Sequence, residues 1–274
     1  MALNIQTNVS SLEAQRNTMK NQNALMKSFN RLSSGFRVNS AADDAAGLGI
    51  SEGMKAQIRS YAVAERNAND AVSMTQTAEA SLGEMHDILG RMRELAMQAA
   101  NGSMGTNDRG YIDTEFTQLK DELTRIQGST KFNGNLLVGS AVTSVTFQVG
   151  LANEANDQIT VNFGGLSLGT ILSANVTTAN GALAALADID NGISTVSTSR
   201  ANFGSVMNRM DVTIASIQTM RINLTAANSR IRDVDVADET SKLSKNQVLT
   251  QAGISILAQA NQIPQSAMTL LGGR

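Results

Sequence analysis

The chain of 274 residues contains no cysteine and no tryptophan, one proline (Pro264) and one histidine (His86). The lack of cysteine excludes a disulfide scaffold, cysteine-based zinc or iron–sulfur sites and a cysteine nucleophile. A single histidine removes most acid–base and metal chemistry as well. Because aromatic residues make up only 3% of the chain and methionine occurs 13 times, the composition favours long helices packed through small and aliphatic side chains over a compact sandwich or barrel.

The charge of the chain is nearly balanced, with 22 Lys and Arg residues against 24 Asp and Glu residues, a formal net charge of −2. Because the basic residues are scattered, they form no electrostatic footprint for a polyanion, and we exclude nucleic acid as a partner. No apolar stretch is long enough to cross a bilayer, and the first residues lack the basic region and apolar run of a secretory signal. By these rules alone, we expect a soluble, cytoplasmic protein without a membrane partner.

Heptad spacing predicts two long helices in the middle of the chain. The first begins near a capping-box-like start at Ser40–Asp43 and ends at the glycines Gly102 and Gly105, so it has about 55 residues and is roughly 80 Å long. Its apolar or small seam residues are Met54, Tyr61, Ala64, Ala68, Ala71, Ala78, Leu82, Met85, Leu89, Met92, Ala96 and Ala99. The second has seam residues Leu186, Ile189, Ile193, Val196, Phe203, Met207, Met210, Ile214, Ile217, Leu224 and Ile231, with Arg200, Arg221 and Asn228 as polar members. Polar seam residues commonly fix the register of paired helices.

The sequence between the two long helices predicts a shorter helix and a small β region. Apolar residues with the same heptad spacing follow Asn107 and continue to Gly128, where we expect the shorter helix to end. In the segment of about residues 131–170, β-branched and aromatic residues then alternate with polar ones on both sides of a turn-rich stretch at 152–157. We expect one or two hairpins there.

The two ends of the chain predict amphipathic helices that pair as a terminal coiled coil. We therefore expect a mainly α fold of elongated antiparallel helical rods with a small β-hairpin region. Its domains would be a terminal coiled-coil domain of residues 1–42 and 236–274 and a rod domain of residues 43–235. The apolar positions that we assign to a self-assembly core are Ile5, Val9, Leu12, Met19, Met26, Leu249, Ile256, Leu257, Ile263 and Leu270. The heptad surface exceeds what one chain can bury, and contacts that do not close would give a filament.

The candidate chemical motifs favour structural roles. Glu84, His86 and Asp87 are spread around a helix, and no second histidine completes a metal site. The glycines of Gly47–Gly53 follow helical rather than strand-like sequence, so they lack the context of a dinucleotide loop. Asp43 and Asp44 could meet the acidic run Asp233–Glu239 if the ends pair, and could then hold a cation or act as an acid–base pair, but helix N-terminal charge compensation accounts for most of these residues. We therefore expect neither an enzyme nor a cofactor.

Several sequence segments resemble bacterial flagellin, and they occur in the same order as in that family. The two terminal signatures are RLSSGFRVNSAADDAAGLGIS (Arg31–Ser51) and SRIRDVDVADETSKLSKNQVLTQAGISILAQANQIPQSAMTLLGGR (Ser229–Arg274). GRMRELAMQAANG, TKFNGNLLVG and SRANFGSVMNRM lie between them. The likeness extends over nearly the whole chain. Many flagellins carry a large variable insertion before the second long helix, whereas the short stretch from Gly164 to Ala187 leaves no room for an outer domain here.

The resemblance implies a subunit that polymerises into the bacterial flagellar filament and serves swimming motility. It also implies type III export without a cleaved signal peptide, which replaces the cytoplasmic expectation by an extracellular one. Flagellins polymerise with copies of themselves and, by family likeness, meet an export chaperone, hook-junction proteins and a cap protein. The positions that match the family's segment for a host receptor are Arg91, Leu95 and Glu115, and for all three a rod interface is the simpler reading.

Three alternatives stay open at the sequence level. An adaptor at the hook–filament junction would share the terminal coiled coils but would join other proteins instead of polymerising extensively. A flagellin-like chain with a hydrolase activity is disfavoured by the short middle region and by the lone His86. A soluble signalling coiled coil is disfavoured because the hairpin region interrupts the heptads.

Overall fold

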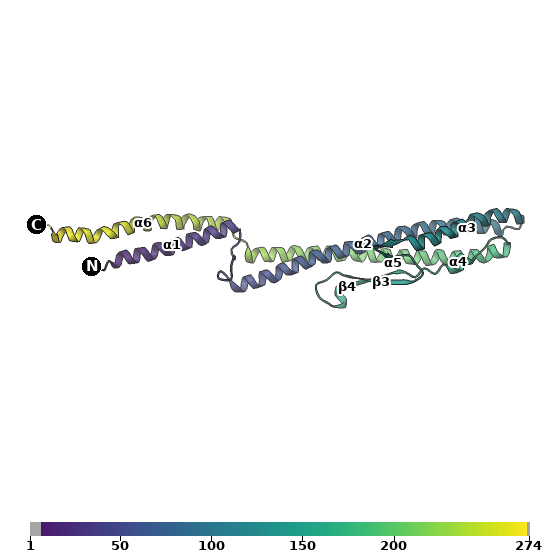
Figure 1. Ribbon diagram of the computed structural model, residues 1–274, viewed down its shortest axis with the longest axis horizontal. Coiled ribbons are helices and arrows are strands. Elements are labelled where there is room, and N and C mark those ends of the chain that lie inside the picture. The colour runs from purple at the N-terminus through teal and green to yellow at the C-terminus, as the bar shows by residue number, and fades with distance from the viewer. Residues whose placement is uncertain (1–6, 273–274) are drawn as a thin grey trace. The chain divides into compact units, whose positions relative to one another are not determined.

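A computed structural model describes the backbone of residues 7–272 and the side chains of residues 7–262 (Figure 1). In chain order its elements are α1 (Val9–Ser34), α2 (Ala45–Ala100), α3 (Thr106–Ser129), β1 (Lys131–Phe132), β2 (Asn135–Leu136), β3 (Val142–Gln148), a 3-10 turn (Ala155–Asp157), β4 (Gln158–Gly164), α4 (Gly169–Ser173), α5 (Ala179–Arg232) and α6 (Val236–Gly272). The predicted mainly α fold with antiparallel helices and a hairpin region is confirmed.

The chain forms two compact units. The first unit contains the residues up to Ala56 and those from Asn223 onward, and the second unit contains Gln57–Ile222. The domains expected from the sequence, 1–42 with 236–274 and 43–235, are divided at other residues than these units and stay a prediction. Because α2 and α5 extend across the division, each unit is described by itself below.

In the second unit, α3 and α5 lie antiparallel to α2. Along the α2–α5 pair, Arg93 Nε donates to Asp190 Oδ1 at 2.7 Å, and Arg200 Nη2 lies 2.7 Å from Glu79 Oε1. The core between the helices consists of the predicted heptad residues, among them Ala68, Ala78, Leu82, Met85, Leu89 and Met92 of α2, Phe116 and Leu123 of α3, and Ile189, Val196, Phe203 and Met210 of α5. Periodic apolar residues therefore explain both why these helices form and how they pack.

The polar seam residues of α5 pair with polar residues of α2. Glu79 accepts hydrogen bonds from Arg200 Nε and Nη2 at 3.0 and 2.7 Å, and Arg221 forms an ion pair with Glu65. In the first unit, Ser51 Oγ donates to Asn228 Oδ1 at 2.7 Å. Each of these residues faces a polar partner instead of the apolar core, and their role in fixing the register stays a prediction.

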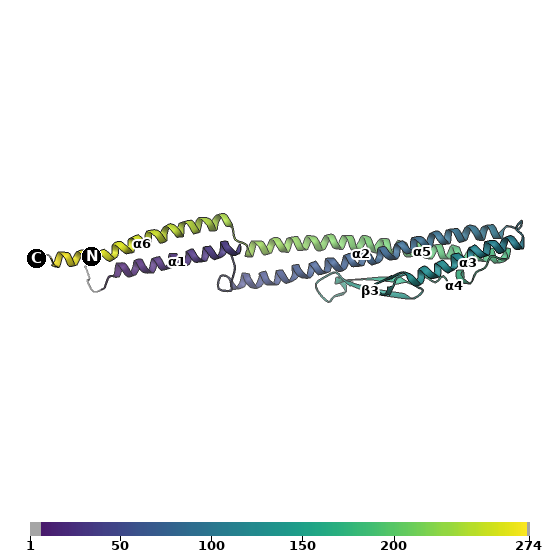
Figure 2. The same ribbon diagram turned by 45° about the horizontal axis from the view of Figure 1, so that its top comes forward.

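Two antiparallel hairpins follow α3. The first, β1–β2, turns at Asn133 and Gly134, whose φ angles of 47° and 86° suit the left-handed conformations of a type I′ turn. The second, β3–β4, pairs Val142 with Gly164 and Gln148 with Gln158. Both views place it beside α2 and α5 (Figures 1 and 2), and the ring of Phe163 lies 5.5 Å from that of Phe203.

In the first unit, α1 and α6 lie side by side and antiparallel (Figure 1). Asn8 Nδ2 donates to the carbonyl oxygen of Ala260 at 2.8 Å, and Arg31 near the other end of α1 lies 3.7 Å from Glu239. The helices approach closely at Gly253, where an added Cβ would stand 2.7 Å from Thr18 Oγ1. The predicted pairing of the two chain ends is confirmed.

Candidate assembly surface

The face of α1 that contacts α6 is mainly small and polar, with Leu25 and Leu32 half-buried on it, and the predicted apolar stripe points away from that contact. Asn8, Ser11 and Thr18 lie on the half-buried side of α1, and Ser28 is buried. The predicted stripe residues are exposed instead: Val9 to 61%, Leu12 to 58%, Met19 to 59% and Met26 to 58%. The stripe therefore does not hold the two helices of one chain together.

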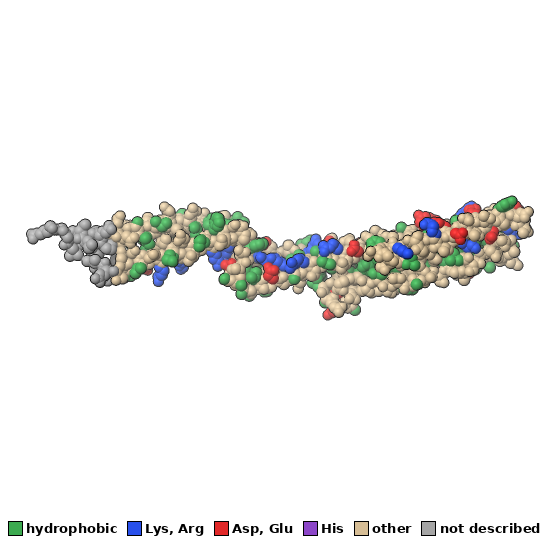
Figure 3. Space-filling model, in the orientation of Figure 1, with side chains coloured by type: hydrophobic (Ala, Val, Ile, Leu, Met, Phe, Trp, Pro, Cys, Tyr) green, Lys and Arg blue, Asp and Glu red, His purple; other side chains and the backbone are tan. Residues whose placement is uncertain are grey.

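The apolar residues of α6 divide between the two faces. Leu249 and Ile256 are exposed to 39% and 57%, whereas Leu257 is half-buried on the side of Ala260, which faces α1. Three predicted positions cannot be placed in this way: Ile5 lies outside the described residues, as do the side chains of Ile263 and Leu270. Hydrophobic side chains are visible over α1 and α6 in Figure 3.

An apolar groove continues this surface between the two terminal helices. It has a volume of about 400 Å³ and is lined by Leu25, Met26, Phe29, Asn30, Leu243 and Gln247. The sequence from Asn246 to Gly273 contains no charged residue. Exposed apolar surface beyond scattered single side chains marks a site of interaction.

The three positions predicted as a rod interface do not all lie at the surface. Arg91 Nε donates to Glu115 Oε1 at 2.9 Å, and both side chains are about half exposed. Leu95 is only 2% exposed and belongs to the apolar core. The surface role expected of Leu95 is therefore corrected: its side chain packs inward, and only Arg91 and Glu115 of the three are available for contact.

Of the acidic residues in this region, Asp43 of the first connecting segment and Glu239 of α6 lie beside the same cation of the chain itself, Arg31. Asp43 lies 2.8 Å from Lys27 Nζ and 3.9 Å from Arg31, which also lies 3.7 Å from Glu239. The hydrogen bond from Lys27 lowers the pKa of Asp43 from 3.8 to about 2, and the backbone amides of Ser40 and Asn39 act in the same direction while burial opposes them. Sequence reasoning missed Arg31 as the partner, although it lies four residues after Lys27 on one helix face.

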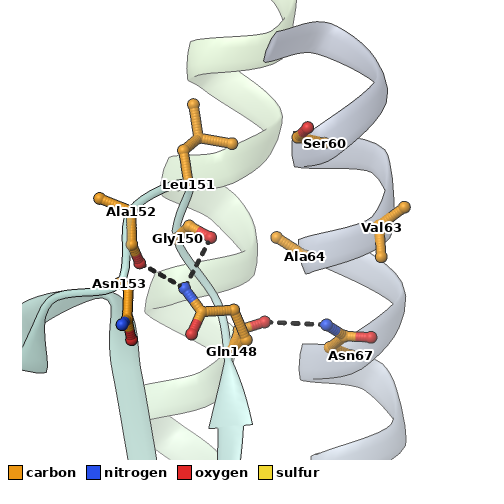
Figure 4. Close-up of a pocket in the computed structure, with 9 residues that line it drawn as sticks. All are labelled: Ser60, Val63, Ala64, Asn67, Gln148, Gly150, Leu151, Ala152 and Asn153. Atoms are coloured by element: carbon orange, nitrogen blue, oxygen red, sulfur yellow. Dashed lines mark hydrogen bonds between the residues drawn. The ribbon is translucent and has the colours of Figure 1, made fainter. Parts of the chain in front are cut away.

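No group of three or more His, Cys, Asp or Glu side chains among the described residues could hold a metal ion. A groove of about 390 Å³ lies between α2 and the end of β3 (Figure 4), where Asn67 Nδ2 donates to the carbonyl oxygen of Gln148 at 2.9 Å. Its described lining consists of Ser60, Val63, Ala64, Asn67, Gln148, Gly150, Leu151, Ala152 and Asn153. None of these side chains titrates near neutral pH, so the groove has no general acid or base.

Within the described part of the chain, no helix combines the length and the hydropathy needed to span a membrane. Heptad-packed helices, paired chain ends and open apolar stripes together define a helical structural protein with surface available for association.

Comparisons with known proteins identify the family. A model of the bacterial flagellin N-terminal helical region matches residues 5–142, and a model of the C-terminal helical region matches residues 186–271. A flagellin of Halalkalibacterium halodurans is 42% identical over 271 residues, which cover 97% of this chain and 99% of that protein. A flagellin of Bacillus subtilis is 39% identical over 310 aligned positions, covering 98% and 100%. The chain belongs to the bacterial flagellin family.

Solved structures agree with this assignment. The crystal structure of Bacillus cereus flagellin is 34% identical and covers 60% of this chain and 94% of that one, with a TM-score of 0.51. A putative flagellar hook-associated protein from Vibrio parahaemolyticus has a TM-score of 0.61 at 15% identity, covering 70% and 100%, which shows a shared fold alone. The chain is thus a structural subunit of the flagellar filament, an extracellular appendage, and the junction adaptor is not favoured.

Proposed function

We propose that the chain polymerises through the outward apolar stripes of α1 and α6, which neighbouring copies bury in the filament. The observation that carries the proposal is that Leu12, Met19 and Met26 are each more than half exposed while the same helix meets α6 mainly through small and polar residues. A helix pair of one chain thus leaves its apolar surface to other chains.

The physical basis is the hydrophobic effect distributed over many side chains. Burying the exposed part of a Leu, Met or Ile side chain contributes about 1–2 kcal/mol. Several such side chains on each helix outweigh the cost of ordering a subunit, which is several kcal/mol. Because the α1 stripe and the α6 stripe are different surfaces, their contacts need not close, and a non-closing heterologous contact builds an open helical polymer.

The finer aspects of this function follow from the family likeness. We infer from membership of a structural-protein family that the chain has no catalytic role. An export chaperone, hook-junction proteins and a cap protein would be its other partners, and export would proceed without a cleaved signal peptide. Contact of Arg91 and Glu115 with a host receptor also stays a proposal, whereas the ion pair between these two side chains is present in the subunit itself.

Seeded polymerisation of the purified full chain, followed by negative-stain electron microscopy, tests the proposal. We expect long filaments from the intact chain and none from a copy without the residues before Gly35, which include α1. Discrete particles from the intact chain would favour the junction adaptor. Normal filaments from the truncated copy would contradict the role of α1.

A further inference from the structure

The two segments that connect the terminal helices to the long helices pair with each other within the first unit, at a point that we call the crossing. Phe36 and Asp233 form an isolated antiparallel bridge. The amide of Val234 donates to the carbonyl oxygen of Gly35 at 3.0 Å, and the amide of Arg37 donates to that of Arg232 at 2.6 Å. Gly35 ends α1 in the left-handed conformation, with a φ of 74°, which directs the chain into this crossing.

A chain of alternating charges ties this crossing to both terminal helices. Lys27 and Arg31 of α1, Asp43 of the first connector and Glu239 of α6 follow one another in the order Lys27, Asp43, Arg31, Glu239. Glu239 is only 3% exposed, and the side chain of Arg31 is 22% exposed. Arg31 is the member with a carboxylate on each side.

The geometry makes Arg31 the centre of this junction. Its Nη1 lies 3.7 Å from Glu239 and its Nη2 lies 3.9 Å from Asp43, so one guanidinium neutralises carboxylates from two separate segments. Without it, the nearly buried Glu239 would keep its charge with no guanidinium beside it. Loss of one partner of a buried ion pair is costly because the remaining charge is not solvated.

The α1–α6 contact depends on this junction for a further reason. The facing side of the pair consists mainly of small and polar residues such as Ser11, Thr18 and Gly253. Leucines such as Leu25 and Leu257 are only half-buried, so the apolar area buried between the two helices is limited. Polar and charged contacts therefore help to set how α1 and α6 are aligned. The ion chain and the crossing lie where α1 ends and α6 begins. Contacts at this shared end of the helix pair can set how the two helices are aligned.

We propose that Arg31 is a positioning residue for filament assembly: by bridging Asp43 and Glu239 it closes the junction and aligns the outward stripes of α1 and α6. The inference rests on the proposed function, because alignment matters only if those stripes are the polymerising surfaces. Arg31 itself acts through the connector and need not touch a neighbouring copy.

The test compares the full chain with Arg31→Gln and Arg31→Lys. Arg230→Gln is the matched control, since it is the same chemical change at an exposed position near the end of α5. In seeded elongation, we expect Arg31→Gln to raise the critical concentration roughly tenfold or more. Arg31→Lys, which keeps the positive charge, should raise the critical concentration less, and the control should keep the parent value.

Hydrogen exchange provides a readout at the junction itself. In filaments pelleted above each variant's critical concentration, we expect the amides of Arg37 and Val234 to exchange roughly tenfold faster in Arg31→Gln than in the parent. Parent-like exchange together with a parent-like critical concentration in Arg31→Gln would overturn the proposal. An effect equal to that of Arg230→Gln would overturn it too, by showing that loss of any nearby positive charge suffices.

The two proposals fail in different ways. If Arg31→Gln assembles normally while charged substitutions in the stripes abolish assembly, only the role of Arg31 is wrong. If the stripe substitutions assemble normally, the proposed function is wrong.

Discussion

The substitution Ile256→Asp probes the assembly surface directly. In the isolated subunit Ile256 is 57% exposed. A change at a site this open alters the stability of the subunit by no more than about 0.5 kcal/mol. In the filament, by contrast, the proposed function buries this side chain against another copy. The same substitution should therefore leave the subunit folded and weaken only its addition to a filament.

The size of the effect follows from the exposed fraction. Full burial of an isoleucine side chain contributes about 1.5–3 kcal/mol, so covering the part of Ile256 that is still exposed contributes about 1–1.5 kcal/mol. Placing an unpaired carboxylate there adds at least about 2 kcal/mol, and the sequence from Asn246 to Gly273 has no charged side chain to offset it. A total near 3 kcal/mol per subunit corresponds to a critical concentration raised about a hundredfold.

Seeded elongation at a series of subunit concentrations measures this quantity. Ile256→Ala removes only the apolar part and should raise the critical concentration by about fivefold. Ser255→Asp places the same charge one residue away and about 100° around the helix, and it should have a smaller effect than Ile256→Asp. A critical concentration for Ile256→Asp within about threefold of the parent, with normal filaments, would refute the reasoning.

Three further predictions concern stability. Phe116 is fully buried, so Phe116→Ala should lower the free energy of unfolding of the second unit by about 3–5 kcal/mol in urea titrations, and a loss below about 1 kcal/mol would contradict the core packing. A double-mutant cycle with Glu79→Gln and Arg200→Gln should give a coupling free energy of about 0.5–1 kcal/mol, because this ion pair is partly exposed; no coupling would remove its part in fixing the register. Because the pKa of Asp43 is lowered from 3.8 to about 2 in the folded state, its contribution to stability is complete above pH 3.8 and is lost as the pH falls toward 2. Asp43→Asn should reduce the loss of sedimentable filament across that pH range, and an unchanged acid profile would contradict the assignment.

The helices could be predicted from the sequence because their apolar residues repeat with a helical period. α2 was expected to have about 55 residues and has 56, and Ala68, Leu82 and Met92 are fully buried as the heptads require. The hairpin region was predicted for the same reason, since Ile159, Val161 and Phe163 alternate and all three are buried. Apolar residues repeat with the period of a helix or strand because one side of that element is buried, so the period can be read from the sequence alone.

The partner of each apolar stripe could not be predicted, because periodicity groups residues on one face without saying what covers it. Leu12 and Met19 repeat like core residues, yet they point away from α6. The contact that joins the ends uses Thr18 and Gly253, which no hydrophobic pattern reveals. Leu95 lies one turn from Arg91 along α2, but sequence adjacency to a surface ion pair did not show that its own side chain is buried.

Long-range charge pairing was also beyond the sequence. Arg31 and Glu239 are far apart in the chain, and only the antiparallel pairing of α1 with α6 brings them within 3.7 Å. The sequence indicated that the acidic connectors could meet and hold a cation. The cation that the structure places there is a guanidinium of the chain itself, together with the ammonium of Lys27.

The most direct test of the central claim is the accessibility of the stripes before and after polymerisation. Because the chain has no cysteine, Met19→Cys and Ile256→Cys each introduce a single thiol whose rate of maleimide labelling can be measured in subunits and in filaments. Our account predicts fast labelling in subunits and labelling slowed by roughly a hundredfold in filaments, as expected for buried side chains. Equal labelling rates in the two states would contradict it.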